Sequence, residues 1–196
     1  MKRIRRQKTF ILLFSSILFF SQLTGQEFTE LVVLDETVIS KEAVINCLRK
    51  NIEILILPAG VNQLQELTEK LKNYKNLEAI HLLVCGKDGV IMLNESPLQN
   101  QSISMYSKEL GLWKESCTPT CDLMIYTCSL AESDEGKLII RRLAAYTGLD
   151  VAASTNVTGN LEEKGDWKLE FMKGKIETTT CFNTEKLAVF SDSLKK

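Results

Sequence analysis

Two cysteines of this 196-residue chain stand where a parallel sheet usually presents reactive groups. Cys85 ends an apolar run that begins at Leu77, and Cys128 ends another that begins at Asp122. In sheets of parallel strands, ligands and catalytic groups gather at the carboxyl ends of the strands. A thiolate there can act as a nucleophile when a base such as histidine takes its proton. Because cysteine is also a common small core residue, position alone leaves both roles open.

The one histidine of the chain, His81, is poorly placed to be that base. It precedes Cys85 by four residues on the same predicted strand, which is roughly 13 Å at about 3.3 Å per residue. A general base must lie about 3 Å from the proton that it takes. We therefore predict a structural role in the core for His81.

A second cysteine pair, Cys117 and Cys121, lies close together in the sequence. A zinc site would need two more ligands near them, so the spacing favours either a disulfide or two separate buried thiols. The chain has no glycine-rich phosphate loop, no dinucleotide fingerprint and no Gly-x-Ser-x-Gly nucleophile motif. We expect neither a metal nor a cofactor.

Small and polar residues at the other predicted strand ends could contribute to binding at the same edge of the sheet. They are Asp35, Gly86, Ser129 and Ser154. An acid at a strand end, such as Asp35, often does no more than accept hydrogen bonds from loop amides.

Apolar runs predict the strands that would position these residues. Long strands are expected at 29–35, 52–57, 77–85, 122–128 and 151–154, with a short one at 90–93 after a turn at 87–89. Helical spacing predicts helices that begin at Ser40, Asn62, Ser104 and Ser133, the last ending at Gly148. This alternation predicts one three-layer α/β domain, with a mostly parallel sheet and helices on both faces. Residues 167–171 and 176–180 are predicted to form a C-terminal β-hairpin.

Residues 1–25 have the pattern of a secretory signal peptide. Five basic residues precede an apolar run at 10–20, and small polar residues follow. The run is too short to span a bilayer, which takes about 20 residues. A retained N-terminal anchor is the alternative. Residues 26–196 would then be an exported domain, secreted or periplasmic, with no membrane contact beyond the signal segment.

The charge balance argues against a nucleic-acid partner. The chain has 24 basic and 25 acidic residues, and removal of residues 1–25 leaves 19 basic residues against the same 25 acidic ones. Nucleic-acid-binding domains usually carry an excess of basic residues. The 44% hydrophobic and 25% charged content is typical of a globular protein.

Sequence blocks across nearly the whole mature region resemble a known bacterial module. The blocks are 31–35, 77–86, 125–131, 143–154, 158–159 and 165–170. On these blocks the chain resembles the bacterial domain of unknown function 4347, which is often found near the N-terminus of very large surface adhesins. The last two blocks are the most specific, and they include Gly165, Asp166 and Trp167. We interpret these three residues as structural, with Trp167 packed on the sheet and Asp166 capping a turn.

The resemblance implies a caspase-like sheet with a site at Cys85 and Cys128. The family has Ser-His-Gly after the third strand and Tyr-Gly-Cys after the fourth, and caspase-like and gingipain-like cysteine peptidases use a histidine and a cysteine so placed. Here Cys85 stands at the position of the histidine, and Thr127 replaces the glycine before Cys128. The resemblance therefore implies a nucleophile position whose base has been lost.

We expect an exported, non-catalytic caspase-like module that binds a protein or peptide at the cell surface. One alternative is a cysteine-dependent hydrolase with Cys128 as the nucleophile and an unidentified base. Another is a dithiol redox protein that uses Cys85 and Cys128. Neighbouring parallel strands lie about 4.8 Å apart, which also permits a disulfide between these two cysteines as a further hypothesis.

Overall fold

The computed structural model describes residues 28–38, 40–87, 89–94, 97–159 and 165–187. The predicted signal peptide lies outside these residues. The strands are β1 (Glu30–Asp35), β2 (Glu53–Leu57), β3 (Leu77–Leu83), β4 (Gly86–Lys87), β5 (Val90–Ile91), β6 (Cys117–Tyr126), β7 (Asp150–Ala153) and β8 (Phe171–Lys173). The α-helices are α1 (Lys41–Asn46), α2 (Gln63–Leu71), α3 (Ser107–Leu112), α4 (Asp134–Thr147) and α5 (Thr184–Leu187), and two 3-10 turns, η1 (Ile103–Tyr106) and η2 (Trp113–Ser116), flank α3. None of the helices within these ranges is long and apolar enough to cross a bilayer.

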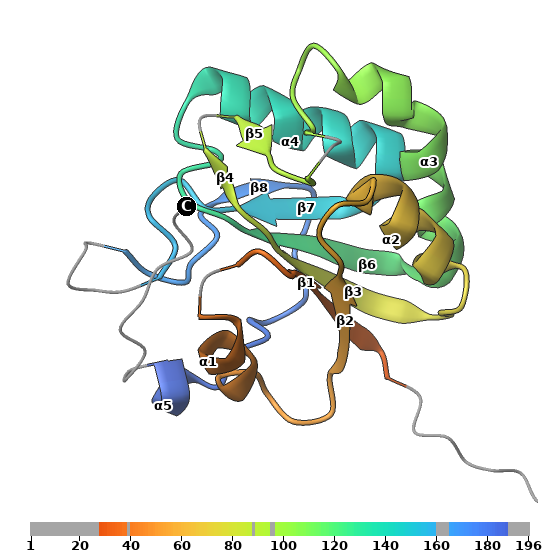
Figure 1. The fold of residues 1–196 in the computed structure, drawn as a ribbon. Helices are drawn as coiled ribbons and strands as arrows, with labels where there is room; N and C mark the ends of the chain where they lie inside the picture. Colours follow the sequence, from red (N-terminus) through yellow and green to blue (C-terminus); the bar gives the residue numbers. More distant parts are fainter. Residues whose placement is uncertain (1–27, 39, 88, 95–96, 160–164, 188–196) are drawn as a thin grey trace, which may run out of the picture.

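A six-stranded sheet forms the middle layer, in the order β2-β1-β3-β6-β7-β8 (Figure 1). The first five strands are parallel to one another, and β8 joins β7 as an antiparallel edge strand. β4 and β5 form a small antiparallel hairpin after β3. The predicted α/β class and mostly parallel sheet are confirmed.

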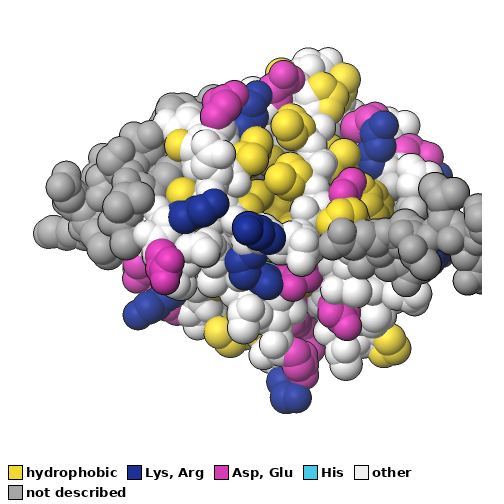
Figure 2. All heavy atoms as spheres, turned by 90° about the horizontal axis from the view of Figure 1, so that it is seen from below, with side chains coloured by type: hydrophobic (Ala, Val, Ile, Leu, Met, Phe, Trp, Pro, Cys, Tyr) yellow, Lys and Arg dark blue, Asp and Glu magenta, His cyan; other side chains and the backbone are white. Residues whose placement is uncertain are grey.

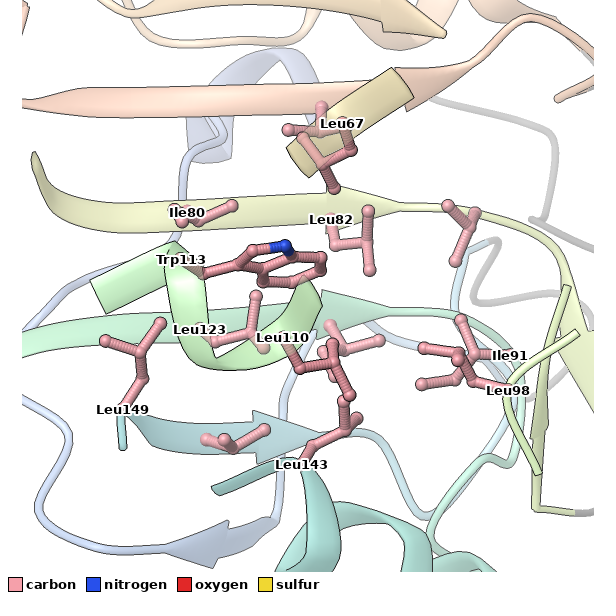
Figure 3. Close-up of a cluster of buried hydrophobic side chains, with 14 of the residues drawn as sticks. Leu67, Ile80, Leu82, Ile91, Leu98, Leu110, Trp113, Leu123, Leu143 and Leu149 are labelled. Carbon is pink, nitrogen blue, oxygen red and sulfur yellow. The ribbon is translucent and has the colours of Figure 1, made fainter. Parts of the chain in front are cut away.

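Helices α2, α3 and α4 cover one face of the sheet and bury the larger core, which we call the α2–α4 core (Figure 3). Leu67, Leu110 and Leu143 come from these three helices and pack over the strand residues Ile80 and Leu123. The leucines of α2 recur at helical spacing, so that they reach the sheet from one side of the helix.

The opposite face carries a second core, which we call the α1 core (Figure 1). It lies beneath α1, α5 and residues 174–183, which we call the C-terminal segment. α1 contributes Val44 and the C-terminal segment contributes Phe182. Trp167 and Leu187 pack against its margin. Helices therefore lie on both faces, as the sequence predicts.

The helix ends confirm most of the predicted caps. The side chain of Asn62 accepts from the Gln65 amide at 3.0 Å, and the Ser133 hydroxyl accepts from the Gly136 amide at 3.1 Å. Gly148 ends α4 in the left-handed conformation, with φ of 70°. Ser40 is the exception: its backbone is also left-handed, with φ of 58°, and its side chain does not cap α1. A capping serine usually has extended backbone angles, which aim its oxygen at the first free amides.

The predicted C-terminal hairpin is wrong. β8 pairs with β7, and residues 175–180 form no strand. Gly174 turns the chain away with φ of 104°, and the following amides donate to two carboxylates of the sheet instead of to β8. Lys175 donates to Asp150, and both Glu177 and Thr178 donate to Asp122.

Candidate functional site

Cys85 and Cys128 lie side by side in the fold at the carboxyl ends of the adjacent strands β3 and β6. Leu83 is paired with Tyr126, and the Val84 amide donates to the Tyr126 carbonyl at 3.3 Å. The two cysteines follow this last pair, and both side chains enter the α1 core. Cys85 is 2% exposed and Cys128 is 7% exposed.

The surroundings of Cys128 are apolar and its thiol is engaged with the backbone. The α1 core around it includes Ala152 and Leu169. Its Sγ donates to the Thr158 carbonyl at 3.7 Å. The next residue, Ser129, has a left-handed backbone with φ of 52°, and its amide donates to the Asn156 carbonyl at 2.6 Å. This loop holds the thiol in the core, with its sulfur against the Thr158 carbonyl.

His81 lies near the middle of β3, is fully buried and faces Glu30. Its Nε2 is 2.9 Å from Oε2 of Glu30, and the same oxygen is 2.5 Å from the Arg49 guanidinium. Its ring stacks on Tyr126 with the ring centroids 6.1 Å apart. Because a carboxylate only accepts, Nε2 must carry the proton in this contact. The predicted core position of His81 is confirmed.

The pKa values of this pair agree with a neutral histidine that donates to a carboxylate. Burial lowers the pKa of His81, and the hydrogen bond and charge of Glu30 oppose that change only in part. Burial tends to raise the pKa of Glu30, but the hydrogen bond from His81 and the charge of Arg49 lower it on balance. A base is therefore present in the fold, but it is committed to Glu30.

The other predicted binding residues hold loops together. Oδ1 of Asp35 accepts from the Thr37 amide at 2.8 Å and from Nε2 of Gln63 at 3.1 Å. The hydroxyl of Ser154 donates to the Asn156 carbonyl at 2.9 Å, and it accepts from the Asn156 amide at 3.1 Å. These contacts order the loops at the carboxyl edge of the sheet.

Gly86 is required by close packing. A Cβ at this position would lie 2.6 Å from Oγ1 of Thr127 and 2.6 Å from the Val90 carbonyl. Thr127 is fully buried, and its Oγ1 has no hydrogen-bond partner among the described residues. The Thr127 side chain is thus packed against Gly86, so that a side chain at position 86 would need the neighbouring atoms to move.

The Gly165-Asp166-Trp167 segment has contacts of the kind expected for a structural motif. Oδ1 of Asp166 accepts from the Lys168 amide at 2.8 Å, which caps the turn. The Trp167 ring packs on Phe182 with the ring centroids 4.4 Å apart, at the margin of the α1 core. Gly165 is buried.

The sequence analysis missed a group of three carboxylates near the middle of β6 and the start of β7. Asp122, Asp150 and Glu177 each place an oxygen within 4.8 Å of the others, an arrangement that could hold a cation. Asp122 and Asp150 are direct neighbours across the two strands. The Lys175 ammonium already lies 2.8 Å from Glu177 and compensates part of the charge. The signal in the sequence is an aspartate before each of the apolar runs 123–126 and 151–153, and the pairing of β6 with β7 places both aspartates on one face.

A comparison with family models identifies the chain. The model of the domain of unknown function DUF4347 matches residues 31–194. The chain belongs to this family. The predicted membership is therefore confirmed over nearly the whole predicted domain. Comparisons with curated proteins and with solved structures each returned no match.

Proposed function

We propose that this DUF4347 protein is an exported, non-catalytic module that acts by binding at the bacterial cell surface. The observation that carries the proposal is the state of the site: both cysteines are buried, and the one histidine of the chain is bound to Glu30 instead of to a thiol. A caspase-like ancestry would account for two cysteines at the ends of neighbouring strands.

Catalysis by Cys128 would need access and a base. The thiol is 7% exposed, and its hydrogen bond goes to a backbone carbonyl. Loss of a general base typically costs about 10²–10⁴ in rate. Thr127 is also packed tightly against Gly86, the residue that follows Cys85. These features favour a binding module over the hydrolase.

The edge strand β2 offers the surface for binding. Ile54 is 37% exposed and Ile56 is 42% exposed. They are paired with Val32 and Leu34 of β1, which places them on the face that carries α1. Figure 2 shows apolar side chains gathered on this face. An edge strand with exposed apolar side chains favours an extended segment of a partner protein, which adds to the sheet as a further strand.

The test compares three full-length chains in an exporting bacterium. One is the natural sequence, one carries Ile54→Lys with Ile56→Lys, and one carries Met105→Lys, since Met105 is 76% exposed on a different element. We expect the natural chain and the Met105 variant to remain with the cells and to be digested by added protease. The double variant should be released into the medium. Equal retention of all three chains would contradict binding through β2.

The same cells test export and the absence of catalysis. The N-terminus of the recovered protein should lie near residue 26, and a protein that retains residues 1–25 would contradict the signal peptide. Cys128→Ala should remain on the cells as well as the natural chain does. Loss of retention by that variant, with its fold intact by circular dichroism, would favour the hydrolase instead.

A further inference from the structure

Cys117 and Cys121 are four residues apart on β6, yet an irregularity of the strand brings them closer together than a straight strand would. In a straight strand this spacing separates two residues by roughly 13 Å. Here Cys117 is paired with Leu77, whereas Asp122 is already paired with Ala79, so the register between β3 and β6 shifts. The extra residues of β6 form a bulge. Within it the Cys117 thiol donates to the Trp113 carbonyl at 3.4 Å, and the Cys121 thiol donates to the Asp122 carbonyl at 3.9 Å.

The geometry of this bulge suits a disulfide. Leu77 and Ala79, the partners of Cys117 and Asp122, are two residues or about 7 Å apart. The bulge between them therefore brings Cys121, the neighbour of Asp122, toward the Cα separation from Cys117 of about 4.4–6.8 Å that disulfides usually have. Both cysteines face the α2–α4 core. Pro119 and Thr120 at the tip of the bulge are exposed, so that the backbone can adjust when the bond forms.

The two thiols differ in the way that an attacking and a resolving thiol differ. Cys117 is partly exposed, whereas the other five cysteines, all within the described part of the chain, are buried. The proximity of Cys121 lowers the pKa of Cys117, whereas the proximity of Cys117 and burial both raise the pKa of Cys121. A thiol that is accessible and more acidic than its neighbour reacts first with an external disulfide.

We propose that Cys117 and Cys121 form a reversible disulfide, with Cys117 as the attacking thiol and a low-molecular-weight disulfide such as oxidised glutathione as the oxidant. The Cys117 thiolate attacks one sulfur of oxidised glutathione and expels one glutathione thiolate, which leaves a mixed disulfide. Cys121 then loses its proton and attacks the Cys117 sulfur, which expels the second glutathione. Two protein thiols are oxidised, and one glutathione disulfide is reduced to two thiols.

This pair is a separate site from Cys85 and Cys128. It lies at the amino end of β6 and on the opposite face of the sheet, since Cys121 belongs to the α2–α4 core and Cys128 to the α1 core. The proposal therefore stands or falls independently of the proposed function.

Peptide mapping of the full chain tests the proposal. The protein is equilibrated with mixtures of oxidised and reduced glutathione, quenched with acid and alkylated without reduction. Cleavage after Lys114 and before Asp122 yields peptide 115–121, which holds Cys117 and Cys121 without Cys128. We expect the oxidised peptide to carry no alkyl group and to be two hydrogens lighter than the same peptide with two free thiols. Treatment with reduced glutathione should restore the doubly alkylated peptide.

Two variants identify the role of each thiol. Cys121→Ser should accumulate glutathione on Cys117, because the resolving thiol is absent. Cys117→Ser should leave Cys121 alkylated and without glutathione at the same ratios. The proposal is overturned if peptide 115–121 of the folded natural chain stays fully alkylated at every ratio, or if glutathione attaches first to Cys121.

Discussion

Two regions of the sheet differ in what they do with their reactive groups. At the carboxyl end, Cys85 and Cys128 lie in an apolar core, and Cys128 is hydrogen-bonded to backbone. Away from that end, Glu30 at the start of β1 lies on the same face of the sheet as His81 and Asp122 near the middles of β3 and β6. The one histidine of the chain is thus hydrogen-bonded to Glu30 at the start of β1.

This difference shows that a cysteine at a strand end and a histidine on the neighbouring strand can each be bonded to other groups of the fold. The polar groups around His81 are hydrogen-bonded: His81 donates to Glu30, and Asp122 accepts the amides of the C-terminal segment. Buried charge is tolerated when it is paired and hydrogen-bonded in this way. We infer that these paired groups contribute stability, whereas under the proposed function the cysteines at the carboxyl end carry out no catalysis.

The largest effect is expected from His81→Ala. This change removes a fully buried ring and leaves Glu30 without one of its donors. We expect the free energy of unfolding to fall by about 4 kcal/mol, as for other large-to-small core substitutions that also break a hydrogen bond. Urea unfolding measures it. A loss no greater than that of Cys128→Ala would contradict the contrast between the two regions.

Gly86→Ala should destabilise the carboxyl end by about 2–3 kcal/mol, because the added methyl group would meet Thr127 and the Val90 carbonyl. Adding Thr127→Ala should relieve part of this loss, so that the two changes together cost less than their sum by about 1 kcal/mol. Thermal unfolding of the four chains gives this coupling. Strict additivity would mean that Thr127 does not close the space beside Gly86.

Acid should lower the stability that the contact between His81 and Glu30 provides. The pKa of folded His81 lies below its ordinary value of 6.5, so the unfolded chain binds the proton first as the pH falls. The contribution of His81 to the free energy of unfolding should therefore be fully present above about pH 6.5. Below that pH the free energy of unfolding should fall by at most about 1.4 kcal/mol per pH unit. The pKa of Glu30 is also lowered, and its contribution should decline in turn below about pH 4.5. The His81→Ala variant should show a flatter profile between about pH 6.5 and 5; an unchanged slope would contradict the assignment.

The smallest effect is expected from Cys85→Ala and Cys128→Ala. Each removes one buried sulfur from the α1 core, and we expect each to lower the free energy of unfolding by about 1 kcal/mol. Retention on cells should not change. A loss of several kcal/mol in either variant would show that the carboxyl end is as heavily stabilised as the region around His81.

The long strands of the sheet can be predicted from the sequence because each corresponds to a local run of apolar residues. Unbroken apolar runs predicted the long strands, and Asn62, Ser133 and Gly148 marked helix ends that the structure confirms. The positions of Cys85 and Cys128 followed from the same runs.

The failures involve contacts between distant segments. The hairpin at 167–180 has suitable alternation, but β7 provides an edge for β8, and Asp122 and Asp150 accept the amides that a hairpin would have used. The His81–Glu30–Arg49 contact joins three elements, which no spacing along the chain reveals. The bulge that joins Cys117 to Cys121 depends on the register with β3.

The rate at which each cysteine of the full chain is alkylated by iodoacetamide between about pH 6 and 8.5 tests the central claim most directly. Quantified by peptide mass spectrometry, Cys117 should react first, and Cys128 should react at about pH 6 no faster than the buried Cys47 and Cys181. Rapid labelling of Cys128 at about pH 6, ahead of Cys117, would reveal an activated nucleophile and contradict the non-catalytic account.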